Sequence, residues 1–333
     1  WLPECAYADG LEIDLAEHGI RYFGLESVGL EAATPPVSPR EAAVCPNGVL
    51  ALARDAALSA LVWNPRSGFP GHPDYREFHD DAIHRLAAGD GACFELPSGE
   101  RLPPGLKYKA IGRAAEKPWY APDRAAARLE ADSAAFTEAV QAAEPGLHFL
   151  PFDAELFGHW WHEGPDWLAA TLKRLAADPG IRVCTCREFV AGAAARALPT
   201  RPAPSSWGQE GNFSFWINPQ TDWIFPLIEA FLGRLNQQKQ RCPKEETRRA
   251  ALDLADRLLH LACASDWPFM IRAGTTDELA REQLGQIFQR LEYLLQALEN
   301  DQIEPALLAE LEAECPAFAE TVNAPYGRIG SIL

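Results

Sequence analysis

The sequence predicts an α/β fold in residues 1–218 followed by an α-helical domain in residues 219–333. In the first part, short apolar runs bounded by turn residues alternate with stretches of helical periodicity, which is typical of a parallel sheet. In the second part the strand pattern stops, and apolar residues recur three and four positions apart in stretches rich in Leu, Ala and Glu. The helices predicted there cover residues 220–241, 244–264, 276–299 and 302–313.

The elements before residue 90 follow in chain order. Residues 10–19 predict a short amphipathic helix closed by glycine, and residues 20–25 predict the strand that follows it. Residues 31–48 are rich in Pro and Ala, and residues 64–82 are rich in Gly, Pro, Asp and Tyr. Both stretches are therefore predicted to be surface loops, which is where barrel enzymes in general place the residues that set their specificity.

The alternation of helices and strands continues around Asp153. Residues 122–144 predict a helix that begins at a Pro-Asp pair, and residues 148–152 predict a buried strand that ends at Asp153. A helix over residues 163–177 and a strand over residues 181–185 are predicted next. In a closed barrel of parallel strands the chemistry lies at the carboxyl ends of the strands, which is where Asp153 is expected.

The composition excludes several classes of partner. The formal charge of -17, from 47 acidic and 30 basic residues, argues against nucleic acids and anionic membranes, and a neutral polymer or small molecule fits better. No run of 18 apolar residues occurs, and the first residues lack a signal-peptide pattern. The eight cysteines are scattered, and Cys184 and Cys186 lack a second pair for a zinc site. We therefore expect a cytoplasmic protein without a metal or another cofactor; the oligomeric state does not follow from the sequence.

Glu4 is the first candidate catalytic residue. It stands in the segment Trp-Leu-Pro-Glu-Cys-Ala-Tyr, between Trp1 and Tyr7, whose apolar and aromatic neighbours desolvate a carboxylate. A buried glutamate paired with an arginine explains these seven residues equally well.

Asp153 is the second candidate, because a cluster of aromatic and imidazole groups follows it. His159, Trp160 and His162 lie within ten residues of Asp153, and so many polar and aromatic groups are unusual for packing alone. Alternatively, Asp153 caps the helix that follows, and either histidine is an ordinary core or surface residue.

Trp207 and Trp216 are candidate sugar-binding residues, because they lie in a glycine-containing loop over residues 205–216. Pyranose rings bury their C–H faces on aromatic rings. Other tryptophans, such as Trp167 and Trp223, stand at helical positions and fill a core equally well. Two carboxylates in aromatic surroundings indicate glycoside chemistry, in which one attacks the anomeric carbon and the other transfers the proton.

These three segments together resemble glycoside hydrolase family 57, specifically its glycogen-branching members. The resemblance implies Glu4 as the nucleophile, Asp153 as the general acid/base, and Trp207 and Trp216 as glucan-contacting residues. It also implies an incomplete (β/α)7 barrel, of which residues 1–218 form the later part, and an α-glucan such as glycogen, amylose or starch as the substrate. The further residues expected to contact the glucan are Trp1, Tyr7, His159, Trp160 and Trp267, the last from the segment Ala-Ser-Asp-Trp-Pro-Phe.

The sequence departs from the family pattern in several places. Residues 26–29 read Glu-Ser-Val-Gly where the family commonly has a histidine-containing segment, and Phe69 and Tyr75 are the candidates for a loop tyrosine that favours transfer over hydrolysis. The chain begins without Met inside the first motif, so we expect a truncated amino terminus. The alternatives are an α-amylase or a 4-α-glucanotransferase, a metal-dependent polysaccharide deacetylase using His159, His162 and Glu163, and a glucan-binding fragment without catalytic activity.

Overall fold

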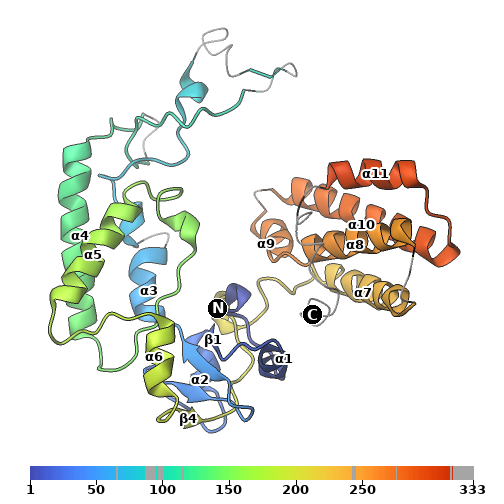
Figure 1. Cartoon of the computed structure of the whole chain (residues 1–333). Coiled ribbons are helices and arrows are strands. Elements are labelled where there is room, and N and C mark those ends of the chain that lie inside the picture. Colours follow the sequence, from blue (N-terminus) through green and yellow to red (C-terminus); the bar gives the residue numbers. More distant parts are fainter. Residues whose placement is uncertain are drawn as a thin grey trace. The chain divides into compact units, whose positions relative to one another are not determined.

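The computed structural model describes residues 1–64, 67–86, 95–96, 99, 101–113, 116–241, 245–274, 276–315 and 317. The chain forms two compact units (Figure 1). The first consists of Trp1 and residues 21–203, and the second consists of residues 2–20 and residues from 204 onward. The first unit combines a small sheet with helices, and the described part of the second consists of helices and irregular segments.

The sheet of the first unit has four strands in the order β1-β3-β2-β4. Their bounds are β1 Tyr22–Leu25, β2 Ala43–Val44, β3 Leu50–Ala53 and β4 Leu198–Pro199. β1 pairs with β3 in parallel, from Tyr22 opposite Leu50 to Leu25 opposite Ala53. β2 runs antiparallel to β3 and parallel to β4. The four residues of β3 are all buried, as expected for a strand with neighbours on both sides.

The helices of the first unit pack their apolar faces around the sheet and around one another. Their bounds are α2 Ser27–Glu31, α3 Ala56–Trp63, α4 Pro122–Ala142, α5 Gly164–Ala177 and α6 Cys186–Ala193. α4 and α5 lie side by side (Figure 1). Between them Phe136 of α4 meets Trp167 of α5 edge to face, with ring centroids 5.3 Å apart. Trp161 and Tyr75 complete this buried aromatic core.

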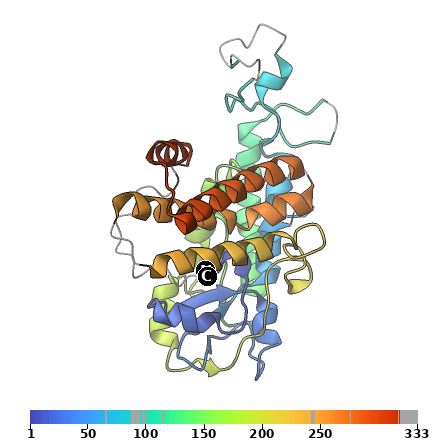
Figure 2. The ribbon, with the colours of Figure 1, turned by 90° about the vertical axis from the view of Figure 1, so that its right-hand side faces the viewer.

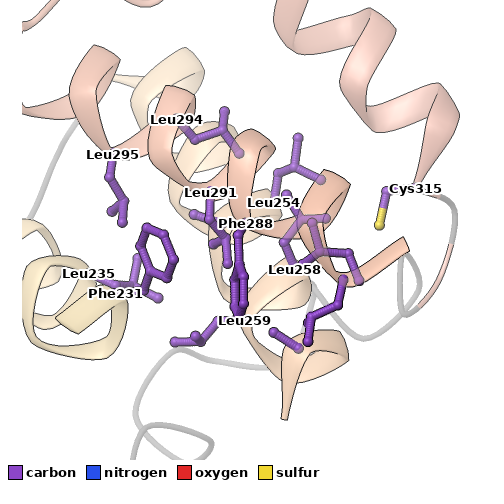
Figure 3. Close-up of a cluster of buried hydrophobic side chains, with 14 of the residues drawn as sticks. Phe231, Leu235, Leu254, Leu258, Leu259, Phe288, Leu291, Leu294, Leu295 and Cys315 are labelled. Carbon is purple, nitrogen blue, oxygen red and sulfur yellow. The ribbon is translucent and has the colours of Figure 1, made fainter. Parts of the chain in front are cut away.

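The second unit is built on a helical core. Its helices are α1 Leu11–Glu17, α7 Ile224–Gln240, α8 Glu246–Ala262, α9 Asp266–Ala273, α10 Asp277–Asn300 and α11 Pro305–Glu314. α8 and α10 pack along each other, and a second view shows the same bundle (Figure 2). Their apolar faces meet α7 in a cluster that includes Phe231, Leu258, Phe288 and Leu291 (Figure 3). None of the described helices is long and apolar enough to span a membrane.

Most of the predicted elements are confirmed. The helices predicted at 10–19, 122–144, 163–177, 220–241, 244–264, 276–299 and 302–313 correspond to α1, α4, α5, α7, α8, α10 and α11, and the strand predicted at 20–25 corresponds to β1. Residue 244 lies outside the described residues. The loop predicted at 31–48 also contains the short strand β2, and the loop predicted at 64–82 contains the short 3-10 helix Phe69–Gly71.

Two predicted strands are wrong. Residues 148–152 are extended but join the sheet at a single bridge, where Phe149 lies parallel to Arg54. Pro151 lacks the N–H that would continue the ladder. Residues 181–185 form no strand and are largely exposed, and a short apolar run does not distinguish a buried strand from an extended loop. This run ends at Thr185, whose side chain forms a capping box with Glu188 and so begins α6.

Candidate active site

Glu4 lies in a short 3-10 helix, Pro3–Cys5, whose backbone is unusual. Glu4 has a φ of 57° and Cys5 a φ of 47°, so two consecutive residues other than glycine adopt the left-handed region. This region costs roughly 1–2 kcal/mol per residue and persists only where the surroundings hold it. Here the Cys5 N–H donates to the Leu2 carbonyl at 2.9 Å, and the Ala6 N–H donates to the Pro3 carbonyl at 2.9 Å.

Trp207 holds Glu4 through both its side chain and its backbone. The indole Nε1 donates to Oε2 of Glu4 at 2.5 Å, and the Trp207 N–H donates to the Glu4 carbonyl at 2.9 Å. Tyr7 and Ser205 form an antiparallel bridge next to this contact, with N···O distances of 2.8 and 3.0 Å. Glu4 is half-buried, and among the described residues its side-chain partner is an indole rather than the arginine of the alternative reading.

Trp216 is fixed by close packing in the same loop. Its side chain is only 8% exposed, and a Cβ added at Gly208 would lie 2.5 Å from its Cζ3. Glycine is therefore required at position 208, because any side chain would displace the ring. The Thr221 hydroxyl donates to the Trp216 carbonyl at 2.6 Å. Trp216 consequently presents little open ring surface, whereas Trp207 is half-buried beside Glu4.

Asp153 ends the extended segment 149–152 in the first unit. It stands immediately before the short 3-10 helix Ala154–Leu156, and its side chain makes no capping hydrogen bond to that helix. The alternative role as a helix cap is therefore not supported by the geometry. Asp153 is half-buried, and its carbonyl accepts from the Leu156 N–H at 3.2 Å.

His159 and Trp160 are exposed and form an aromatic cluster with Phe78. The ring centroid of Phe78 lies 4.5 Å from that of Trp160 and 5.0 Å from that of His159. The ammonium group of Lys107 lies 3.8 Å above the Phe78 ring, a favourable cation–π distance. Sequence reasoning missed Phe78 because it lies in the predicted loop 64–82, and only tertiary contacts bring it to the two other rings.

The remaining predicted glucan contacts differ in exposure. Trp1 is 47% exposed, whereas Tyr7 is buried and its hydroxyl donates to Oε2 of Glu12 at 2.6 Å. Trp267 packs against the helical core of the second unit, and its indole N–H donates to the Leu261 carbonyl at 2.7 Å. These side-chain hydrogen bonds of Tyr7 and Trp267 are both made within the second unit.

A buried polar network lies where β1 and β3 end. Glu26 follows β1 and pairs with Arg54, which follows β3, at 2.6 Å. The next residue, Asp55, is buried and is contacted by Arg40 and by His148, whose Nδ1 lies 2.7 Å from Oδ2 of Asp55. Burial alone would raise the pKa of Asp55, but hydrogen bonds from His148, the Leu58 N–H and Arg40 lower it below its ordinary value.

One residue of the departing segment 26–29, Glu26, belongs to this network. Glu26 also accepts a hydrogen bond from the Ser27 N–H. The segment in which the family commonly has a histidine therefore contains, in this chain, a carboxylate with a structural role. The residues of the network carry no signal in a single sequence, since they come from four separate segments. Parallel strands end at one edge of the sheet, and this is where such groups gather.

His162 and Glu163 do not form a metal centre. Glu163 is buried and His162 is exposed, and among the described residues no group of three His, Cys, Asp or Glu side chains converges on a metal-binding position. The deacetylase hypothesis therefore has no support from the geometry. The candidate loop residues also have packing roles: Phe69 contacts Trp167, and the buried Tyr75 hydroxyl donates to Asp132 at 2.7 Å.

Known proteins resemble the chain along its whole length. Residues 228–325 match the family model of the carboxyl-terminal region of 1,4-α-glucan branching enzymes. A probable 1,4-α-glucan branching enzyme of Mycobacterium tuberculosis is 31% identical over 352 residues, which cover 100% of this chain and 60% of the relative. The chain thus spans three fifths of that relative's length.

Two solved structures share the fold. The α-amylase AmyC of Thermotoga maritima superposes with a TM-score of 0.84 at 26% identity, covering 100% of this chain and 64% of that one. A glycoside hydrolase family 57 branching enzyme of Thermococcus kodakaraensis, crystallised with glucose, gives 0.79 at 27% identity and covers 98% and 64%. These similarities agree with the resemblance found in the motifs: along its whole length the chain is similar to branching enzymes and to enzymes of glycoside hydrolase family 57.

Proposed function

We propose that the chain is part of a 1,4-α-glucan branching enzyme, which cleaves an α-1,4 bond and transfers the released segment to a 6-hydroxyl of a glucan. The contact between Glu4 and Trp207 carries this proposal. It joins two of the family-like motifs, which lie 203 residues apart in the chain, through a 2.5 Å hydrogen bond. The carboxylate is thereby oriented from one side by an N–H donor that takes no part in bond cleavage.

The proposed reaction has two steps with distinct roles for the two carboxylates. In the first step the Glu4 carboxylate attacks the anomeric carbon, while Asp153 gives its proton to the departing 4-oxygen. A glycosyl ester on Glu4 results. In the second step Asp153 takes the proton of the acceptor's 6-hydroxyl, whose oxygen attacks the anomeric carbon and releases Glu4. Two inversions at one carbon retain the α configuration.

We place residues 1–218 in the later part of an incomplete (β/α)7 barrel and residues 219–333 in the α-helical domain. The parallel pair β1 and β3 and the helices α4 and α5 support the first assignment. The family-model match over residues 228–325 supports the second.

The α-glucan is proposed to contact exposed or half-exposed aromatic rings. Trp1, His159, Trp160 and Trp207 offer such rings, with Trp160 50% exposed. We also assign Tyr7, Trp216 and Trp267 to substrate binding, where Tyr7 and Trp216 are buried and Trp267 is partly buried, so that their packing positions the neighbouring segments.

Substitution of the two carboxylates in the full-length protein tests the proposal. Glu4→Gln and Asp153→Asn should each abolish branching of amylose, followed as the fall in iodine staining. Glu210→Gln and Glu155→Gln are matched controls, because both residues are exposed and stand close in sequence to Trp207 and Asp153. Branching that survives Glu4→Gln would contradict the assignment.

A second candidate is an α-amylase or a 4-α-glucanotransferase, favoured by the similarity to AmyC. All three activities share the glycosyl-enzyme and differ in the acceptor, which is water, a 4-hydroxyl or a 6-hydroxyl. Treating the product with a debranching enzyme separates them, because only a branching enzyme creates new α-1,6 bonds. Products that contain only α-1,4 bonds would favour the second candidate.

A further inference from the structure

A pocket of about 710 Å³ lies between α4 and α5 in the first unit. Its size falls within the range of about 300–1,000 Å³ that is typical of small-ligand sites. Pro122, Ala125 and Leu129 of α4 give it an apolar wall, and neither Glu4 nor Asp153 lines it. The pocket does contain His162 and Glu163, the two residues of the aromatic motif that the proposed reaction leaves without a role.

Glu163 supplies a buried acceptor in the lining of this pocket. Its side chain is 6% exposed, and Oε1 accepts from the Arg76 N–H at 3.2 Å. Oε2 is buried and has no hydrogen-bond partner of good geometry in the part of the chain that the structure describes, and the carboxylate also interacts with the Tyr120 hydroxyl. Glu163 precedes α5, yet its side chain makes no capping bond to that helix and instead faces the pocket. A carboxylate can accept about four hydrogen bonds, and the Arg76 N–H and the Tyr120 hydroxyl use only part of this capacity, so Glu163 can still accept from a ligand that carries a donor.

The other polar groups of the pocket offer both donors and acceptors. Burial and a hydrogen bond to the Glu163 carboxylate raise the pKa of Tyr120, so its hydroxyl stays protonated. Partial desolvation on one side of the exposed His162 ring, together with Arg76, lowers the pKa of His162, which favours the neutral imidazole. The rim carries acidic groups as well as the basic residues Lys173 and Arg174.

This mixture of charges selects against ionic ligands. A cation that approached Glu163 would also meet the two basic residues of α5, and an anion would meet the carboxylates of Glu163, Asp166 and Glu130. A neutral ligand with many hydroxyl groups can donate to the carboxylates and to the Tyr120 oxygen, and can accept from Lys173. It can also lay its C–H faces on the apolar wall and on the Tyr120 ring, as sugars do.

We propose that the pocket between α4 and α5 is a second glucan-binding site, which holds a segment of α-glucan through Glu163 and Tyr120. The proposal rests on the proposed function for the identity of the sugar, while the site itself rests on the pocket. A glucan held there would stay attached to the protein while other parts of the polymer react, which raises the effective concentration of the substrate chain.

Calorimetric titration with maltoheptaose tests the second site. The full-length protein carries Glu4→Gln so that the ligand is not consumed. Ala126→Phe fills the pocket from its α4 wall, and Ala127→Phe is the matched control, because Ala127 is exposed on the same helix but does not line the pocket. We expect two classes of maltoheptaose site, of which Ala126→Phe removes one and Ala127→Phe neither.

A second variant addresses the buried acceptor directly. Glu163→Gln preserves volume but replaces the charged acceptor, and should weaken maltoheptaose binding to the second site at least about tenfold, as for a lost hydrogen bond to a charged group. Equal maltoheptaose binding by the Ala126→Phe and Ala127→Phe proteins would overturn the proposal. A pocket that binds the cation spermidine but not maltoheptaose would overturn it as well. Branching activity of the unmutated protein is measured separately. If Ala126→Phe loses one maltoheptaose site, the second glucan-binding site is supported even where the unmutated protein shows no branching. If the unmutated protein branches amylose but Ala126→Phe leaves binding unchanged, the second site is refuted and the proposed function is not.

Discussion

Replacing Trp207 by phenylalanine removes the indole N–H that holds Glu4 and keeps an aromatic ring at this position. The bond is short, 2.5 Å, and its acceptor is a carboxylate, so its loss costs about 1.5–3 kcal/mol where nothing replaces it. If the bond orients the nucleophile, this energy is lost in the transition state. At about 1.4 kcal/mol for each factor of ten, kcat/KM for branching should fall about 10- to 150-fold.

Trp223→Phe is the control for this prediction. The Trp223 indole also donates one hydrogen bond, to the Gln220 carbonyl at 3.0 Å, and the ring packs against the helical core. Both variants therefore lose one indole hydrogen bond, but only Trp207 contacts Glu4. Initial branching rates on amylose and thermal unfolding are measured for both. The reasoning is refuted if both variants retain full activity, or if both lose activity in proportion to their loss of Tm.

Three further predictions concern stability and its dependence on pH. Gly208→Ala should destabilise the protein by about 1–3 kcal/mol, because the new Cβ would lie 2.5 Å from the Trp216 ring. Gly233→Ala should instead stabilise the protein by up to about 1 kcal/mol, because a Cβ added at Gly233 in α7 would meet open space. Equal urea midpoints for the two variants would contradict this prediction. Burial, and to a lesser extent the Asp256 carboxylate, raises the pKa of Asp253 from 3.8 to about 6. The contribution of Asp253 to the free energy of unfolding therefore falls as pH rises from about 4 to 6. The effect of Asp253→Asn on the free energy of unfolding should therefore be more favourable at pH 7 than at pH 4 by about 1–2 kcal/mol, a value reduced for partial exposure. An equal effect at both pH values in urea unfolding would argue against this prediction. Asp55→Ala should cost about 3–5 kcal/mol at pH 7, because it leaves Arg40 and His148 without their buried partner. Since the pKa of Asp55 is lowered, its contribution is present above pH 3.8 and is lost as pH falls further; a cost as small as that of Asp178→Ala, at a partly exposed residue, would refute the network.

Helices could be predicted from the sequence better than strands. α8 and α10 have long apolar faces whose period is set by the helix itself, and these faces meet in the core as expected (Figure 3). A strand depends on neighbours that the local sequence does not specify. Residues 148–152 have a strand-like pattern, yet they bond to the sheet only through Phe149, because hydrogen bonding also requires a suitably placed partner.

Only those candidate site residues that lie in contiguous motifs could be predicted from the sequence. The sequence singles out Glu4, Asp153 and Trp207 as candidates because their neighbours in the chain are unusual. Phe78 and Asp55 were missed, because each acquires its surroundings only from distant segments. Exposure was equally hidden: in the pair Trp160 and Trp161, the first is 50% exposed and the second 1%, although their local sequence contexts are nearly the same.

Both proposed catalytic carboxylates stand at short 3-10 turns rather than within regular elements. Glu4 lies inside the turn Pro3–Cys5 with a left-handed backbone, and Asp153 immediately precedes the turn Ala154–Leu156. A residue at such a turn can point away from the packed face of its unit, since no helical or strand period dictates its direction. The left-handed backbone at Glu4 is compensated by contacts with a distant loop, chiefly the two hydrogen bonds from Trp207. The orientation of the proposed nucleophile therefore depends on the loop 205–216, and substitutions that loosen this loop should lower activity before they lower stability.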